Sequence, residues 1–511
     1  MDIINELRFR NSNDTNHHIY SLKDGAVRSI TLAEFDRKAT AVASRLHELG
    51  LGKGDRVGIM SSNCIEWAIL DLAVLKIGGV MAGLEVGRFD VRSSIETYGL
   101  RLMFVEGPAQ ADVLTMETVS EWANATRKTA FCPVDRYGPD DVCAIKFTSG
   151  STGPPKGMEA TVGGINDSIT AVQAMFDHGD GDNILIFLRL AILQQRYWIY
   201  SALAFGHDIT ITSLDQVTPV AQAVHPTVIM GVPGFFDEVK RKLETEYTGL
   251  EDRTVRKQAI ESEFGGRIRY LWTGSAPASR ALLEFYNDCG VPLYQGYGLN
   301  ETCIVAKNCP GANRVGSVGK VLPNKTVRFD DRGVLIVGSS NPIIRRYSWC
   351  SPGDNERMFL ASGEVVTHDA GYLDDDGYLY ILGRVDDVIV LSTGRNILVG
   401  PIEEDVRNTP EVHDCVLYGH GKPFLTAVVS AASTRFDRIE NHIRNMNTSL
   451  FPEQQIRGLV ISPEQFSIDN GLLTSQFKPI RKEIYARLAR EIGAVYEEGG
   501  GESLIVRTAG R

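Results

Sequence analysis

The sequence predicts an α/β protein whose large N-terminal part contains layered, mostly parallel sheets. Three observations support this prediction. The chain has 511 residues, more than one ordinary domain contains. Its composition, 43% apolar and 23% charged, is that of a globular protein and argues against a disordered or fibrous chain. Strand and helix patterns alternate from the N-terminus to about residue 300.

The first elements illustrate this alternation. Thr31 is expected to cap an amphipathic helix, with Glu34 as its capping-box partner. Residues 55–60 are expected to form a buried strand, and Asn63 is expected to cap the helix that follows. Residues 142–147 form another apolar run of strand length.

After residue 310 the pattern changes to short β-rich runs with Gly and Asp, which predicts a β-barrel-like part. Asp-Asp-Gly at residues 375–377, between two apolar runs, predicts a hairpin. A polar junction at residues 383–387 precedes a further apolar strand, and a small α+β segment completes the chain. Composition alone gives only a weak boundary near residue 384.

Charge and cysteine content narrow the class of protein. Acidic side chains outnumber basic ones, 64 to 53, and no basic block offsets the net charge of −11. This argues against a nucleic-acid or membrane-surface protein. The eight cysteines form no CxxC pair and no cluster with zinc-ligand spacing, so we expect reduced thiols and a cytoplasmic location.

Membrane insertion is not expected either. The N-terminus has no apolar core of the signal-peptide type. The most apolar long stretch, residues 184–206, contains Arg189 and Arg196. Each charge at the centre of a bilayer costs about 2.5–3.5 kcal/mol.

The strongest local signal is FTSGSTGPPKG at residues 147–157, directly after an apolar strand. Glycines allow backbone N–H groups to approach an anion, hydroxyls add donors and Lys156 adds charge, so the segment suits a polyphosphate. It is not a Walker A loop, because Lys156 lies between Pro155 and Gly157. The alternative, a mobile surface loop, is less favoured because of the lysine and the two prolines.

This segment resembles the phosphate-binding signature of the adenylate-forming (ANL) superfamily, which includes acyl-CoA synthetases, nonribosomal-peptide adenylation domains and firefly-type luciferases. Further motifs similar to those of the family follow in family order. They are TGSAP at 273–277, QGYGLNET at 295–302, THD at 367–369, GRVDD at 383–387, STGRNI at 392–397 and SQFKPIRK at 475–482. Residues 310–320 and 388–404 look most like the long-chain acyl-CoA synthetase branch.

The resemblance implies a domain organisation and a reaction. Residues 1–383 would form the adenylation domain, 384–386 a hinge and 387–511 a small mobile domain that carries the catalytic lysine. A hydrophobic carboxylate would attack the α-phosphorus of ATP and release pyrophosphate, and the thiol of CoA would then displace AMP. ATP, Mg²⁺ and CoA are thus expected. One alternative is an acyl-AMP ligase that serves an acyl carrier protein or partner enzyme; another is a degenerate nucleotide-binding regulatory protein.

The resemblance also assigns roles to individual residues. The phosphates would be held by Thr148, Ser149, Gly150, Ser151, Thr152, Gly153 and Lys156. The adenine side would be formed by Gly274, Ser275, Ala276, Pro277, Tyr297 and Gly298. Glu301 would bind Mg²⁺, with Asn300 beside it. The alternative readings are a surface glutamate for Glu301 and a core aromatic for Tyr297.

The remaining roles belong to the second half of the chain. Asp369 would accept the ribose hydroxyls with help from Arg384, unless it only caps a turn. Lys478 would act on the carboxylate and the α-phosphate, with Lys482 as the nearest competitor. Gly394 would line the pantetheine passage.

The sequence departs from the family pattern near the expected acid site. Asn300 stands where Thr is usual, and His368 replaces the middle Gly of TGD. Arg189 and Ile192 stand where long-chain relatives carry Pro and His, and Val162 replaces a frequent His. These changes favour a bulky acid of polyketide or terpenoid type over an ordinary fatty acid. Nearby aromatics could shape the pocket or belong to the core: Tyr197, Trp198 and Tyr200.

Overall fold

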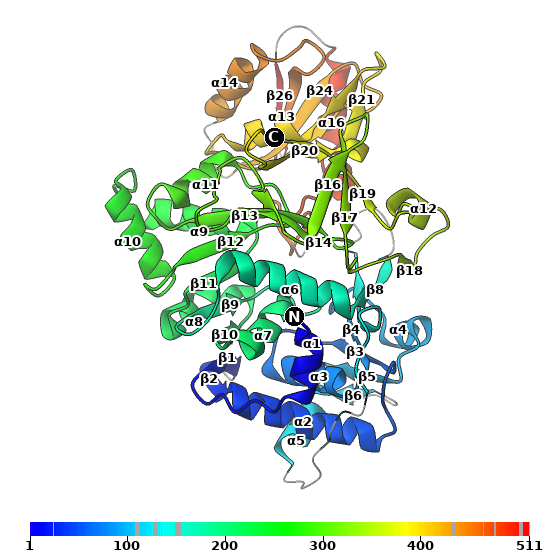
Figure 1. Cartoon of the computed structure of the whole chain (residues 1–511). Coiled ribbons are helices and arrows are strands. Elements are labelled where there is room, and N and C mark those ends of the chain that lie inside the picture. The colour runs from blue at the N-terminus through cyan, green and yellow to red at the C-terminus, as the bar shows by residue number, and fades with distance from the viewer. Residues whose placement is uncertain are drawn as a thin grey trace.

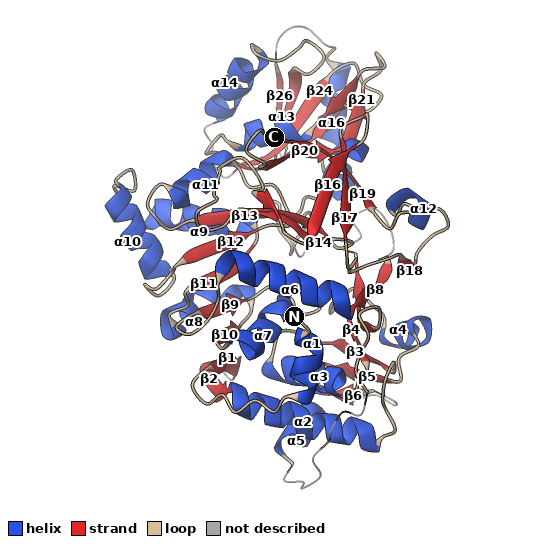
Figure 2. Ribbon diagram, in the orientation of Figure 1, coloured by secondary structure: helices blue, strands red, loops and turns tan. Residues whose placement is uncertain are grey.

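The computed structural model describes residues 1–23, 25–107, 113–125, 131, 133, 135–148, 155–431, 436–462, 464–474, 477–499 and 504–509. A large N-terminal part, blue to green in Figure 1, carries a smaller C-terminal part in yellow to red. Mixed sheets and many helices make up both parts, as Figure 2 shows.

One mixed sheet of the large part runs in the order β15-β14-β13-β12-β11-β9-β10-β1-β2. Its centre, from β1 to β13, is parallel, and its edges are antiparallel. The strands are β1 (His18–Lys23), β2 (Ala26–Thr31), β9 (Asn183–Ile186), β10 (Asp208–Ile211), β11 (Val228–Gly231), β12 (Tyr270–Thr273), β13 (Leu293–Leu299), β14 (Cys303–Lys307) and β15 (Lys320–Val321).

A second mixed sheet has the order β18-β8-β7-β4-β3-β5-β6 and is parallel from β7 to β6. Its strands are β3 (Arg56–Met60), β4 (Val80–Gly83), β5 (Leu102–Val105), β6 (Leu114–Thr115), β7 (Val142–Phe147), β8 (Gly157–Thr161) and β18 (Tyr347–Trp349). The expected phosphate loop connects β7 to β8, which pair antiparallel, so its two ends are adjacent.

The largest core lies between these two sheets and is filled by helices. The helices that contribute to it are α1 (Ile3–Phe9), α2 (Leu32–Glu48), α3 (Ile65–Lys76), α5 (Met116–Asn124), α6 (Val162–Phe176) and α7 (Leu193–Phe205). Helix α3 is apolar on nearly every face, and accordingly every residue from Trp67 to Lys76 is buried. In Figure 2 α6 crosses the molecule next to this core.

A second core covers the other face of the first sheet with helices from the middle of the chain. They are α8 (Val217–Val224), α9 (Pro233–Glu246), α10 (Arg253–Glu263) and α11 (Arg280–Asn287), with the short η1 (Leu214–Gln216) before them. Helix α4 (Val91–Tyr98) lies near β5 of the second sheet, and α12 (Asp354–Met358) lies beside β19.

The β-rich part expected after residue 310 is an antiparallel sheet in the order β16-β17-β19-β20. Its strands are β16 (Lys325–Phe329), β17 (Val334–Ser339), β19 (Val365–Leu373) and β20 (Leu379–Arg384). The hairpin expected at residues 375–377 connects β19 to β20. The expected hinge residues fall at the end of β20 and in η2 (Val385–Asp387); the division of the chain at 384–386 stays a prediction.

The C-terminal part is α+β, as expected. A β21–β22 hairpin precedes a mixed sheet in the order β23-β24-β25-β26. The strands are β21 (Val388–Val390), β22 (Asn396–Leu398), β23 (Val412–Tyr418), β24 (Leu425–Ala431), β25 (Ile456–Ser462) and β26 (Ile505–Thr508). The helices are α13 (Gly400–Arg407), α14 (Phe436–Asn447), α15 (Arg481–Arg487) and α16 (Ala489–Glu497).

Local predictions can be compared with these elements. Thr31 caps α2, since its hydroxyl accepts a hydrogen bond from the Glu34 N–H at 3.1 Å. Asn63 does not cap α3, so that prediction was wrong. Its amide instead donates to the carbonyls of Phe187, Leu188 and Thr212, because tertiary partners outcompete the local one.

Two further observations concern the part of the chain that the structure describes. No helix there is long and apolar enough to cross a membrane. The segment around residues 184–206 forms instead β9 and the buried helix α7.

Candidate active site

The pairing of β19 with β20 places two predicted nucleotide-binding residues side by side. Asp369 lies opposite Arg384 in the register of these strands, and the guanidinium Nη1 lies 3.6 Å from the carboxylate Oδ1. The hydroxyl of Tyr297, on β13, donates a hydrogen bond to the same carboxylate. Burial raises the pKa of Asp369, although Arg384 and the Tyr297 hydroxyl oppose the rise.

Lys478 reaches this cluster from the C-terminal part. Burial lowers the pKa of its ammonium, while the Asp369 and Glu301 carboxylates act in the opposite direction. Lys478 therefore lies within electrostatic range of Asp369, Arg384 and Glu301. Glu301 and Lys478, more than 170 positions apart in the chain, thus interact electrostatically.

The neighbouring Phe477 fixes this position. Its ring packs against Gly234, at the start of α9, where an added Cβ would lie only 2.8 Å from the Phe477 Cβ. Phe477 also packs on the core of the C-terminal sheet. One side chain therefore connects the cores of both parts directly beside Lys478.

Glu301 is buried, with only 6% of its surface exposed, and it lies in the turn between β13 and β14. The Tyr347 hydroxyl donates to its Oε1 at 2.6 Å. Tyr347 lies on β18, which pairs with β8 directly after the phosphate loop. The Lys156 ammonium lies 4.9 Å from the centre of the Tyr347 ring, so Tyr347 stands between Glu301 and Lys156.

Lys156 also forms an ion pair, because its Nζ lies 3.0 Å from Asp354 Oδ1. Burial would raise the pKa of Asp354, but Lys156 and Arg357 outweigh it and hold the pKa below its usual range. Lys156 is also hydrogen-bonded to Thr148 at the other end of the loop. The Lys156 N–H donates to the Thr148 hydroxyl, and the Thr148 N–H donates to the Lys156 carbonyl, both at 3.0 Å. The expected phosphate ligands between them lie outside the described residues: Ser149, Gly150, Ser151, Thr152 and Gly153.

The expected adenine-side loop follows β12 directly. A Cβ at Gly274 would lie 3.4 Å from the carbonyl oxygen of Gly296, so the loop runs close to β13. Ser275 and Pro277 are exposed, and Ala276 is half-buried. Gly298 lies at a bulge where a Cβ would approach the Cys303 oxygen to 2.1 Å, which only glycine avoids.

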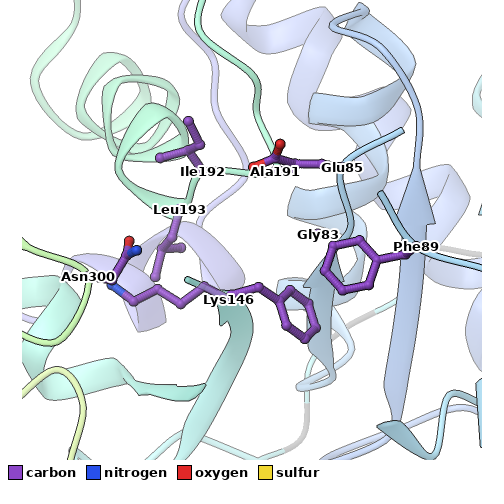
Figure 3. A pocket seen from close by; sticks show the side chains of 9 residues that line it. Gly83, Glu85, Phe89, Lys146, Ala191, Ile192, Leu193 and Asn300 are labelled. Atoms are coloured by element: carbon purple, nitrogen blue, oxygen red, sulfur yellow. The ribbon is translucent and has the colours of Figure 1, made fainter. Parts of the chain in front are cut away.

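A small cavity lies beside Asn300, the residue before Glu301 in the chain (Figure 3). It is lined by Gly83, Glu85, Phe89, Lys146, Phe147, Ala191, Ile192, Leu193 and Asn300. Asn300 and Ile192, two of the departures from the family pattern, thus line one cavity. Arg189 is exposed at its edge, with Nη1 3.3 Å from Glu85 Oε2, while Val162 is buried at the start of α6.

Some predicted residues lie elsewhere. Gly394 is exposed in the turn between β21 and β22, with φ +78°. The aromatic residues of α7 belong to the core between the sheets, which is one of the two readings that the sequence left open: Tyr197, Trp198 and Tyr200. His368 has φ +59°, the left-handed conformation that the glycine of the family motif adopts easily.

Sequence reasoning missed three residues of the site, namely Lys146, Tyr347 and Asp354. Tyr347 and Asp354 belong to no motif and act through contacts with distant residues. Lys146 carried a usable signal, since it is the one charged residue in the apolar strand β7. Burial lowers the pKa of Lys146, although Cys303 and Glu301 oppose this.

Comparison with known families decides the class. A model of the AMP-binding enzyme matches residues 9–337, and a model of the AMP-binding enzyme C-terminal domain matches residues 386–500. The chain belongs to the AMP-binding enzyme family. The expected membership of the adenylate-forming superfamily, the fold class and the enzyme class are thereby confirmed. This AMP-binding enzyme is an ATP-dependent acid–thiol ligase of the acyl-CoA synthetase type.

Its relatives carry ligase names. The long-chain-fatty-acid–CoA ligase FadD15 of Mycobacterium bovis is 27% identical over 582 aligned positions, with 95% of each chain covered. The 2-succinylbenzoate–CoA ligase of Bacillus cereus is 24% identical, with 76% of this chain and 80% of the relative covered.

Solved structures share the fold of this AMP-binding enzyme. ATP-bound MatB from Rhodopseudomonas palustris superimposes with a TM-score of 0.79 at 21% identity, covering 96% of this chain and 99% of that one. The anthranilate CoA ligase AuaEII in complex with anthranoyl-AMP gives a TM-score of 0.79 at 17% identity, with 97% and 98% covered.

Proposed function

We propose that this enzyme converts a hydrophobic carboxylic acid to an acyl-adenylate and then to an acyl-CoA. In the first step a carboxylate oxygen forms a bond to the α-phosphorus of ATP, and the bond to pyrophosphate breaks. In the second step the CoA thiol loses its proton, its sulfur bonds to the acyl carbon, and AMP leaves. The observation that carries the proposal is the convergence of Asp369, Arg384, Lys478 and Glu301.

Each of these residues has a place in the first step. Asp369 and Arg384 suit the ribose hydroxyls. The Asp369 carboxylate can accept hydrogen bonds from these hydroxyls, and the Arg384 guanidinium orients the carboxylate. Tyr297 lies beside them and suits the adenine face, although its hydroxyl is bonded to Asp369. The Lys478 ammonium suits the first step, in which two anionic groups, the carboxylate and the α-phosphate, approach each other. Catalysis of such transfers depends mainly on positioning the reactants and neutralising their charge.

Glu301 fits a magnesium site. Among the described residues no three His, Cys, Asp or Glu side chains form a complete metal site. Mg²⁺ suits a site with one carboxylate, because it commonly takes its other ligands from water and substrate phosphates. Tyr347 orients Glu301, and Lys156 lies beyond Tyr347 on the phosphate-loop side. Magnesium bound there would neutralise phosphate charge.

The acyl acceptor and the location are part of the proposal. We favour CoA, with Gly394 lining the thiol passage after the C-terminal part rotates about residues 384–386. A carrier protein is the alternative acceptor. We expect the enzyme in the cytoplasm.

A pyrophosphate-release screen over diverse carboxylic acids, with and without CoA, tests the function. Acyl-CoA formation is expected only when CoA is present; pyrophosphate release without any acyl-CoA would favour a carrier-protein acceptor. Binding of ATP without acid-dependent pyrophosphate release from any acid would instead indicate a regulatory protein.

Lys478→Ala is expected to abolish acid-dependent ATP–pyrophosphate exchange and to leave ATP binding, measured by calorimetry, nearly intact. Lys482→Ala is the matched control, because Lys482 is the neighbouring lysine at the start of α15. If exchange proceeded at the normal rate in Lys478→Ala, the role given to Lys478 would be wrong.

A further inference from the structure

Lys146 is a buried cation that the proposed function does not yet use. It lies on β7, two residues before the phosphate loop, and only 6% of its surface is exposed. Its side chain lines the cavity, and in Figure 3 its ammonium points toward Asn300. A buried ammonium is costly unless an anion or hydrogen-bond acceptor meets it.

Other buried lysines of this chain have such partners. The Lys307 ammonium donates to the carbonyls of Thr273 and Tyr294 at 2.9 and 2.6 Å. Lys76 pairs with Asp36 at 3.0 Å. Among the described residues, none forms a hydrogen bond or an ion pair with the Lys146 ammonium. Lys146 therefore differs from Lys307 and Lys76, whose charges are compensated within the core.

Nearby charges leave the Lys146 ammonium in need of an acceptor. Glu301 is the carboxylate that acts on it electrostatically, but Glu301 already accepts a hydrogen bond from Tyr347 and also acts on Lys478. At the far side of the cavity, Glu85 is engaged by Arg189 and Arg88. The polar end at Lys146 and Asn300 therefore suits an anion that enters from outside.

Apart from Glu85, the other side chains that line the cavity are apolar and give this anion an orientation. Phe89 and Phe147 form an aromatic wall, with ring centres 4.8 Å apart, and Leu193 faces the same space. The cavity volume is about 20 Å³, which is room for about one water molecule, so a carboxylic acid enters only after side chains of this wall change rotamer. A carboxylic acid with its head at Lys146 and its apolar body toward Phe89 matches this division.

We propose that Lys146, with Asn300, binds the carboxylate of the acid substrate and holds it on the Glu301 side for attack on ATP. This inference rests on the proposed function and adds to it a specific carboxylate-binding residue.

The test compares Lys146→Met with wild type, using hexanoate, phenylacetate and hexadecanoate as probe acids in steady-state pyrophosphate release. Methionine keeps the length of the chain and removes the charge. Because a hydrogen bond to a charged group is lost, we expect the KM for each accepted acid to rise at least about tenfold. The KM for ATP should stay within about threefold, and Lys146→Arg should recover part of the loss.

Lys325→Gln is the matched control. Lys325 is equally buried, at 7% exposed, and also lies near Cys303, but its ammonium donates to the Ser339 hydroxyl at 3.3 Å outside the cavity. Its acid KM should equal that of wild type. A purely structural role for Lys146 would lower kcat or thermal stability in Lys146→Met without a selective change in acid KM, which would overturn the inference.

Other outcomes also decide the question. Adipate, which has a second carboxylate, is an additional probe. If Lys146→Met raised the KM for adipate and left that for hexanoate unchanged, Lys146 would bind the second acidic group, and the inference would be wrong. If wild type released no pyrophosphate with any acid, the proposed function itself would fail, and this inference with it. An active wild type with an unchanged Lys146→Met variant would refute the inference alone.

Discussion

Asp414 offers a measurable test of how the two parts of the enzyme meet. It lies on β23, next to His413, whose Nδ1 is 2.6 Å from Nη1 of Arg241 on α9. Burial raises the pKa of Asp414 from 3.8 to about 7, and Asp237 on α9 adds to the rise, while Arg407 and Arg241 oppose it. The perturbation is Asp414→Asn, which keeps the shape of the protonated side chain and removes the titration.

The sign follows from proton linkage. Between pH 3.8 and about 7 the folded state holds a proton on Asp414 that the unfolded chain releases, so stability falls as pH rises through this window. His413 acts in the opposite sense. Burial and Arg241 lower its pKa from 6.5 to about 4, so its contribution to stability rises with pH in that range. Only the difference between variant and wild type isolates Asp414.

The magnitude comes from the size of the shift. At 1.36 kcal/mol per pKa unit, the stability of Asp414→Asn relative to wild type should grow by about 2–3 kcal/mol between pH 5 and pH 8. All five tryptophans precede residue 384, so tryptophan fluorescence does not report on the C-terminal sheet. Hydrogen exchange of β23 and β24 amides, corrected for intrinsic rates, measures the opening free energy there.

Asp437→Asn, at an exposed carboxylate at the start of α14, is the control and should leave the pH dependence of wild type unchanged. If the difference between Asp414→Asn and wild type changed by less than about 0.5 kcal/mol over this pH range, Asp414 would not be desolvated and the reasoning would be refuted.

Two further predictions concern backbone positions in the predicted motifs. Gly394→Trp should spare ATP–pyrophosphate exchange, because a Cβ at Gly394 meets nothing within 4 Å, and should block acyl-CoA formation; an equal acyl-CoA yield would contradict the passage assignment. His368→Gly should keep the free energy of unfolding within about 1 kcal/mol of wild type, whereas the β-branched His368→Val should lower it by about 1–2 kcal/mol, because residue 368 has φ +59°. Equal melting temperatures for the two variants would count against backbone strain at this position.

The sequence predicted features that depend on local chemistry or on strand pairing. The Thr31 cap formed because its partner Glu34 is three residues away. The apolar run at residues 142–147 became β7 with the same bounds. The family resemblance pairs Asp369 with Arg384, and the short hairpin that connects their strands places the two residues opposite each other.

Long-range partners were beyond the reach of sequence patterns. Asn63 looked like a cap but binds three carbonyls more than 120 residues away. Tyr347 orients Glu301 across 46 residues, and Lys156 pairs with Asp354 nearly 200 residues later. Such contacts depend on how sheets and loops pack, which hydrophobic periodicity does not encode.

On the roles proposed for Lys478 and Gly394, the arrangement in this structure would serve only one of the two half-reactions. Both residues belong to the C-terminal part, yet Lys478 lies beside Asp369 and Glu301 while Gly394 is on the surface. The Phe477 contact with Gly234 holds the segment that carries Lys478 against the N-terminal part. On the roles proposed above, delivering the thiol past Gly394 would require this contact to break, so the proposal needs contacts between the two parts that exchange within one turnover.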